Sequence, residues 1–192
     1  MTFGELLEES KNLVEQLSDT VKEEFRPLSI DQLNWKPSAK KWSVIECLDH
    51  INTAGRHYIK HISKNLDLGQ NTNSDLNREY HAGFWGKKAA ESMKPAEGGV
   101  IKNKMSTFPS MMPDYSNLNT EMVIDETDYQ FETFLNLIKR SENYDLEKVK
   151  IKSLLGGLLM FKLGDAYSFS LNHAHRHIVQ AKNVMKHQYF PR

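Results

Sequence analysis

Apolar residues recur three and four positions apart along four long segments, and this periodicity limits the fold of the chain more than any other feature. That spacing places apolar side chains on one face of an α-helix and polar side chains on the other. We therefore predict four main helices. They cover residues 2–25, 43–68, 127–141 and 165–187.

The predicted helix starts carry residues that satisfy the free backbone N–H groups of a first turn. We identify three capping boxes, in which Ser or Thr is followed three residues later by Glu or Gln. They are formed by Thr2 with Glu5, by Ser29 with Gln32, and by Ser43 with Glu46. Thr127 and Asp165 are the expected N-caps of the last two helices.

The segments between these helices carry weaker patterns. We interpret residues 70–125 as a long crossover between the second and third helices, because prolines and glycines interrupt any helical pattern there. Residues 144–163 are interpreted as an irregular connection, although residues 149–152 alternate like a strand.

The composition argues against several classes of protein. Lys and Arg number 25, as do Asp and Glu, so no net charge favours nucleic acid, a membrane surface or an acidic partner. Neither a secretory signal nor an apolar run long enough to span a membrane is visible. The single cysteine, Cys47, excludes an intrachain disulfide and fits a reducing cytosol. We expect one cytoplasmic domain over residues 1–192.

Three histidines occupy alternate positions near the C-terminus. His173 and His177 lie four apart on a helix, so both rings can hold one metal ion. His175 is rotated by about 200° from His173 and cannot share that ion. The alternative is a solvated helix face rich in histidine, and we interpret His175 and Arg176 as an outward, solvated basic pair. A transition-metal site needs a third ligand from elsewhere.

The best donor for that third ligand is His50, in the second predicted helix. It lies in a motif of Lys41-Trp42-Ser43, then Glu46, then Asp49-His50-Ile51, and His-x3-His-x2-Gln follows near the C-terminus. Together with Leu33-Asn34-Trp35-Lys36-Pro37, these motifs resemble the DinB/YfiT-like family of metal-binding four-helix bundles. The resemblance spans about residues 3–187.

The resemblance implies an all-α fold, a four-helix bundle in up-down-down-up order with a long crossover between helices two and three. It implies a divalent metal bound by His50, His173 and His177 at one end of the bundle, and it implies a homodimer. Zinc or nickel is favoured, with iron, manganese and copper left open. Related members include thiol S-transferases that use bacillithiol or mycothiol, and maleylpyruvate isomerases.

Three neutral imidazoles leave a divalent ion with its full charge and an open position, so it can activate a bound water or a thiolate. The preferred hypothesis is an enzyme that transfers a low-molecular-weight thiol to an electrophile. A non-catalytic metal-binding or stress-response protein is the first alternative, and a metal-dependent hydrolase is the second. An apolar pocket of ligand size at the ion would favour an enzyme.

Other residues near these motifs have two interpretations each. Glu46, Asp49 and Gln180 are candidates to orient a ligand imidazole or to contact a bound ligand. Glu46 can instead serve only the capping box, and Gln180 only helix packing. Cys47 is either a core residue or a reactive thiol beside His50.

The crossover also has two interpretations. It either folds over the metal end as a lid or only packs on the bundle. His81, with Tyr80 and Trp85, is a candidate to reach the site from it.

Overall fold

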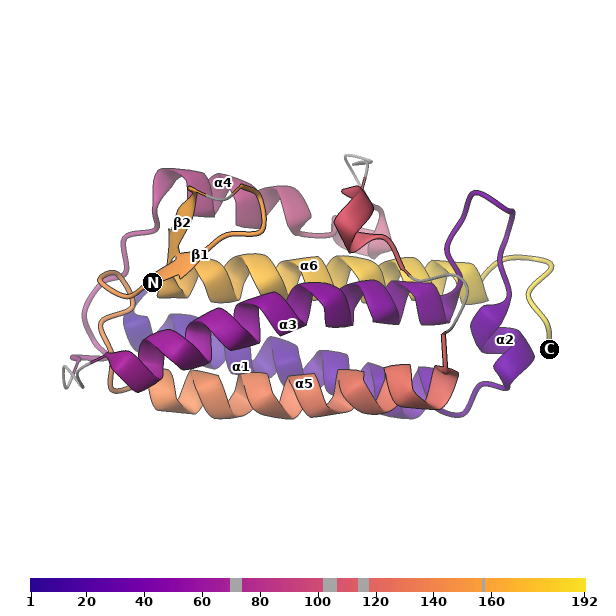
Figure 1. The fold of residues 1–192 in the computed structure, drawn as a ribbon, viewed down its shortest axis with the longest axis horizontal. Helices are drawn as coiled ribbons and strands as arrows, with labels where there is room; N and C mark the ends of the chain where they lie inside the picture. The colour runs from indigo at the N-terminus through magenta and orange to yellow at the C-terminus, as the bar shows by residue number, and fades with distance from the viewer. Residues whose placement is uncertain (70–73, 102–106, 114–117, 157) are drawn as a thin grey trace.

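The computed structural model describes residues 1–69, 74–101, 107–113, 118–156 and 158–192, which are mostly helical (Figure 1). The helices are α1 (Phe3–Thr20), α2 (Ile30–Asn34), α3 (Val44–Leu68), α4 (Phe84–Met93), α5 (Thr120–Ser141) and α6 (Leu163–Met185). Two short strands, β1 (Lys150–Lys152) and β2 (Met160–Lys162), form a hairpin. Single turns are formed by Val21–Phe25, which continues α1 as a π-helical turn, and by Glu97–Gly99 and Pro109–Met111.

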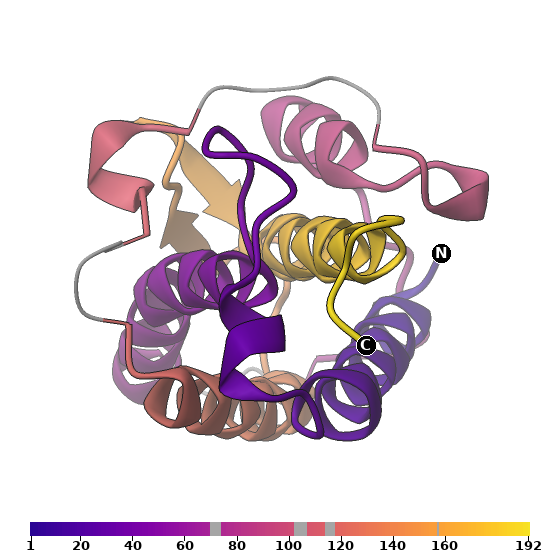
Figure 2. The same cartoon turned by 90° about the vertical axis from the view of Figure 1, so that its right-hand side faces the viewer.

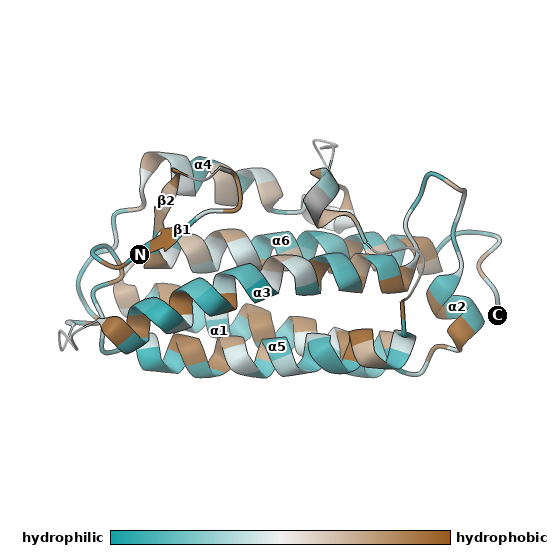
Figure 3. Ribbon diagram, in the orientation of Figure 1, coloured by the Kyte–Doolittle hydropathy of each residue, from teal (hydrophilic) through white to brown (hydrophobic). Residues whose placement is uncertain are grey.

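The four long helices α1, α3, α5 and α6 lie side by side and enclose the core (Figures 1 and 2). Both α1 and α3 pack against α5 and α6. In Figure 1, α1 and α6 run from left to right, whereas α3 and α5 run in the opposite direction. Hydrophobic and hydrophilic residues alternate along each helix (Figure 3), as amphipathic helices require.

The interior is filled by large side chains from all four long helices. Tyr58, Phe131 and Tyr167 are fully or almost fully buried there, together with Val14 of α1. Burying a large apolar side chain contributes roughly 1.5–3 kcal/mol, so this shared core supplies much of the stability of the fold. No helix in the described part of the chain combines the length and apolar character that a membrane crossing requires.

The three predicted capping boxes are confirmed. The Thr2, Ser29 and Ser43 hydroxyls each accept a hydrogen bond from the backbone N–H three residues later. At the start of α3, the Ser43 N–H in turn donates to Glu46 Oε2 over 2.8 Å. This reciprocal pair fixes where α3 begins and therefore the position of His50 along the helix.

The two other predicted N-caps are wrong. Helix α5 begins at Thr120, and the side chain of Asn119 caps it by accepting a hydrogen bond from Met122 N over 3.1 Å. Thr127 is buried inside α5, where its hydroxyl donates to the backbone of Val123, four residues earlier, and also contacts a side-chain oxygen of α3. A threonine that bonds within its own helix has the same sequence signature as a threonine that caps one.

Asp165 also lies inside a helix, because α6 begins at Leu163 with Lys162 at the cap position. The Asp165 carboxylate is buried and accepts hydrogen bonds from Tyr80 Oη over 2.7 Å and from Gly83 N over 3.0 Å. It therefore fastens the crossover to the start of α6 instead of capping the helix.

The crossover contains a helix that the sequence did not reveal. Helix α4 packs along α6, on the side away from α5 (Figure 2). Gly86 permits this approach, since a Cβ atom there would lie 2.4 Å from Cγ of Asp165. Residues 70–73, 102–106 and 114–117 of the predicted crossover lie outside the described residues.

The interpretation of residues 144–163 as wholly irregular is also wrong. Strands β1 and β2 pair in antiparallel register, with Ile151 opposite Phe161, and both of these side chains are buried. The alternation over residues 149–152 was therefore a true strand signal, although each strand is only three residues long.

Candidate metal centre

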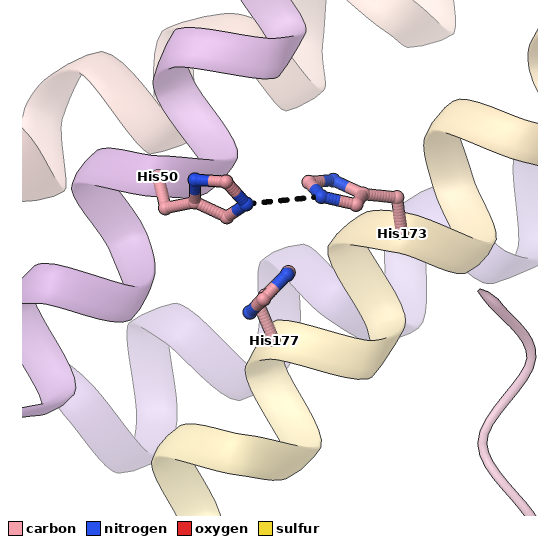
Figure 4. Close-up of side chains that lie close together, drawn as sticks. All are labelled: His50, His173 and His177. Carbon is pink, nitrogen blue, oxygen red and sulfur yellow. Dashed lines mark hydrogen bonds between the residues drawn. The ribbon is translucent and has the colours of Figure 1, made fainter. Parts of the chain in front are cut away.

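Three imidazoles from two neighbouring helices converge on one point (Figure 4). His50 projects from α3, and His173 and His177 project from adjacent turns of α6. One ring nitrogen of each lies within 4.8 Å of the corresponding nitrogens of the other two. The Nε2 atoms of His50 and His173 are 3.1 Å apart. The sequence analysis expects these three histidines to lie together, and the structure places their rings close to one another.

Two of the rings have their orientation fixed by an acceptor on the far side. His50 Nδ1 lies 2.7 Å from the carbonyl oxygen of Met111, and His177 Nδ1 lies 3.1 Å from Oε1 of Gln180. An oxygen acceptor requires the proton on Nδ1, which leaves the lone pair of Nε2 facing the common space. This is the tautomer that a metal ligand needs.

Burial keeps all three rings neutral. Desolvation lowers the pKa of His50, outweighing its hydrogen bond to Met111. Burial, followed by the charges of His50 and Arg176, lowers the pKa of His173 to about 3. The pKa of His177 also lies well below its ordinary value, first because of burial and then because of the two other histidines. Neutral imidazole is the form that binds a metal ion.

Aromatic rings surround the three histidines. The Trp42 ring centroid lies 4.9 Å from that of His50 and 5.6 Å from that of His177. Phe169 stacks on His173 with centroids 6.2 Å apart. These rings restrict the rotation of the imidazoles and remove water from their faces.

A cavity of about 660 Å³ adjoins the three histidines. One wall is a face of α6 that includes His173, His177 and Gln180. Another part of the lining is largely apolar and comes from the crossover and the hairpin loop. It includes Met93, Ile101, Phe108, Met111, Met112 and Leu154. Volumes of roughly 300–1,000 Å³ are typical of small-molecule sites, so the cavity has the size of a ligand pocket.

Arg176 is a residue of the site that the sequence analysis misplaced. Its side chain is 6% exposed and lines the cavity, so the interpretation as an outward, solvated residue is wrong. Its spacing of three from His173 places it on the same side of α6, and this was the available signal. His175 is half-buried, and it is not among the described lining residues.

Glu46 and Asp49 do not line the cavity in the described part of the chain. Glu46 completes the capping box, and Lys36 Nζ lies 2.6 Å from its Oε1. Asp49 is half-buried, and its backbone carbonyl accepts a hydrogen bond from Thr53. Of the three residues considered as supports for the histidines, Gln180 contacts one of them, the ring of His177.

Cys47 is fully buried in the apolar core, and burial strongly raises the pKa of its thiol. A thiol with a raised pKa is a poor nucleophile, which supports the interpretation as a core residue. His81 does not reach the site, because its ring is exposed and lies 3.3 Å from Glu147 Oε1.

The donor set fits a divalent transition metal. Nitrogen ligands about 2.0–2.1 Å from a tetrahedral zinc ion lie about 3.3 Å from one another. The 3.1 Å separation of the His50 and His173 nitrogens is close to that value, and the upper limit of 4.8 Å requires only small side-chain rotations. The acceptors of His50 and His177 already favour the ligating tautomer of these two rings.

Comparison with known proteins agrees with this geometry. The family model described as the DinB superfamily matches residues 12–181, which include all three histidines. No curated protein and no solved structure is significantly similar to the chain.

Proposed function

The chain belongs to the DinB superfamily, and from this premise we propose that it is a metal-dependent enzyme whose ion is held by His50, His173 and His177. The proposed reaction is the transfer of a low-molecular-weight thiol to an electrophile. The observation that carries the proposal is the convergence of three neutral imidazoles, two of them oriented by a fixed acceptor, beside a cavity of ligand size.

Each neighbouring group of this chain has a defined part in such a site. A bound divalent ion supplies Lewis acidity, which favours the thiolate form of a thiol. The Met111 carbonyl and Gln180 hold His50 and His177 in the ligating tautomer. Trp42 and Phe169 limit access of water to the imidazole rings. The apolar wall, with Phe108 and Met112, accommodates the body of an organic substrate.

The alternatives explain less of the site. A protein that only binds metal, for example in a stress response, has no need for a largely apolar cavity of about 660 Å³ beside the ligands. Many hydrolases place a carboxylate at the attacking water as general base. Among the described residues that line the cavity there is no Asp or Glu to serve in this way, and this supports the transferase over a carboxylate-assisted hydrolase.

Zinc or nickel remains the preferred ion, because three imidazoles suit borderline metals. The same donors accept iron, manganese or copper, and supply in the cell decides between them.

The wider assignments follow from the family. We assign the four long helices to the up-down-down-up bundle of the DinB/YfiT type and treat residues 1–192 as one domain. We also propose a homodimer, as the family resemblance implies. We propose a cytoplasmic location too, which the single, unbridged cysteine supports.

Elemental analysis of the purified, untagged protein tests the metal site. We expect about one transition-metal ion per chain in the wild type and almost none in His50→Ala. His57→Ala is the matched control, because His57 lies on the same helix and contacts the backbone of Lys152 instead of the site. Retention of the metal in His50→Ala would refute the three-histidine site.

If the metal is present, the loaded protein is screened for transfer of small thiols to electrophiles. Turnover that disappears in His50→Ala and persists in His57→Ala would support the enzyme. A fully loaded protein that turns over none of the thiol and acceptor pairs would favour the metal-binding alternative.

A further inference from the structure

The cavity beside the three histidines has a one-sided charge distribution. Its described lining contains three cationic side chains, Lys40, Lys41 and Arg176, beside the neutral imidazoles of His50, His173 and His177. It contains no carboxylate among the described residues, although the whole chain has equal numbers of acidic and basic residues. A pocket lined by one sign of charge concentrates ligands of the opposite sign.

Among the described cationic residues that line the pocket, Arg176 is the buried one. It is 6% exposed, whereas Lys40 and Lys41 are exposed. It is adjacent to His177 in α6 and lines the same cavity as the three histidines. Arg176 also interacts within the protein, but a guanidinium group presents five N–H donors and can hold a ligand oxygen as well.

The two walls of the cavity differ in chemistry. Arg176, Gln180 and Asn183 follow one another at helical spacing on the α6 wall, over about 10 Å of helix rise. The methionine, phenylalanine, isoleucine and leucine side chains that the crossover and the hairpin loop contribute to the lining offer no charge. A ligand that satisfies both walls has an apolar body and an anionic group at one side.

From this arrangement we propose that the cavity binds an apolar organic molecule bearing one carboxylate, with Arg176 as the residue that binds the carboxylate. A single buried guanidinium matches a single carboxylate in charge and in bidentate geometry. The inference rests on the proposed function only in that the substrate occupies this cavity. It names the chemical class of that substrate and places its anionic group beside the proposed ion site, because Arg176 is next to His177 in sequence.

Calorimetric titration with two probes of equal length, octanoate and its neutral analogue octanamide, tests the proposal. We expect the wild type to bind octanoate at least tenfold more tightly than octanamide. The preference should disappear in Arg176→Gln, while octanamide affinity and metal content stay unchanged. Arg140→Gln is the control, because Arg140 is an exposed residue of α5 that pairs with Asp67. It should retain the full preference.

The same titrations on metal-free protein separate this proposal from the metal site. We expect the preference for octanoate to persist without metal, even if the protein binds no metal at all. A preference that requires the metal would mean that the carboxylate binds the ion, and it would overturn the role of Arg176.

Two further outcomes also decide the matter. Wild-type protein that binds neither probe, or binds both equally, would overturn the proposal. If Arg176→Gln does not fold, Arg176→Lys replaces it, since an ammonium group keeps the charge and loses the bidentate geometry. We then expect at least a threefold smaller preference, and an undiminished preference would contradict the assignment.

Discussion

His50 and His177 each use one ring nitrogen for a fixed acceptor and present the other to the space that they share with His173. The identity of the acceptor matters because a neutral imidazole has only one N–H group. If the proton moved to Nε2, the ring would lose its ligating lone pair. The carbonyl of Met111 and the side chain of Gln180 therefore influence metal affinity without touching the metal.

Gln180→Leu tests this dependence. We expect metal affinity to fall by roughly 10- to 100-fold, because His177 loses the acceptor that holds its proton on Nδ1. Competition with a chromophoric chelator measures the change. Gln180→Glu keeps an acceptor oxygen and should bind metal at least as well as the wild type. Gln16→Leu, on the exposed side of α1, should have no effect, and an equal loss in that variant would point to a general disturbance of the fold.

Side-chain spacing could predict only part of this site. His173 and His177 are four apart on one helix and were found from that spacing, whereas His50 needed the family motif. The Met111 acceptor could not be predicted, because a backbone carbonyl is present at every residue and has no signature in sequence. Arg176 was misplaced because α4 and the following turn cover a face of α6 that a simple bundle would expose.

At the scale of elements, the hairpin and the crossover are held together by one carboxylate. Glu147 lies between α5 and β1, and its oxygens accept hydrogen bonds from Lys162 Nζ over 2.8 Å and from His81 N over 3.1 Å. Arg78 Nη2 lies 3.5 Å from the same carboxylate. Burial alone would raise the pKa of Glu147, but the hydrogen bonds from Lys162 and His81 lower it to about 2.

Glu147→Gln should therefore change the pH dependence of stability. A carboxylate with a pKa near 2 in the folded state and about 4.3 in the unfolded state stabilises the fold above pH 4.3. That contribution is lost as the pH falls toward 2. We expect Glu147→Gln to be less stable than the wild type at pH 7, and the difference to shrink between pH 5 and pH 2.

Urea unfolding at these pH values provides the measurement. Glu132→Gln, on the exposed face of α5, should match the wild type throughout. A difference between wild type and Glu147→Gln that is the same at pH 7 and at pH 2 would show that the charge of Glu147 is unimportant.

Elements were predictable where the local signal was sufficient. The starts of α1, α2 and α3 follow from capping boxes that the structure contains. Helix α4 was missed because Gly86 interrupts its pattern, and the helix depends on close packing against Asp165 of α6. This packing depends on residues that are distant in sequence, so the local helix propensity of residues 84–93 does not predict it.

For the whole molecule, the position of the ligands in the sequence matters most. His50 and His173 are 123 residues apart, and their helices α3 and α6 are direct neighbours in the bundle. A metal ion that binds both helices binds the folded state far better than the unfolded chain. Its binding free energy is therefore added to the free energy of unfolding.

Thermal unfolding with and without metal tests this linkage. At a free zinc concentration of 100 times its Kd, the gain is about 2.7 kcal/mol. For a chain of this size, that gain raises Tm by roughly 5–10 °C. His173→Ala should show almost no increase on addition of zinc. An increase of the same size in that variant would mean that the ion binds elsewhere.

The four long helices carry both the core and the three histidines, whereas much of the apolar cavity wall lies outside them. Met93, Ile101, Phe108 and Met112 belong to the crossover, and among these only Met93 is part of the buried core. Exposed or half-buried wall residues tolerate substitution at little cost in stability. Substitutions in the crossover can therefore change which molecules enter the cavity while the four long helices and the three histidines stay the same. One stable scaffold can in this way acquire different substrates through changes in a single connecting segment.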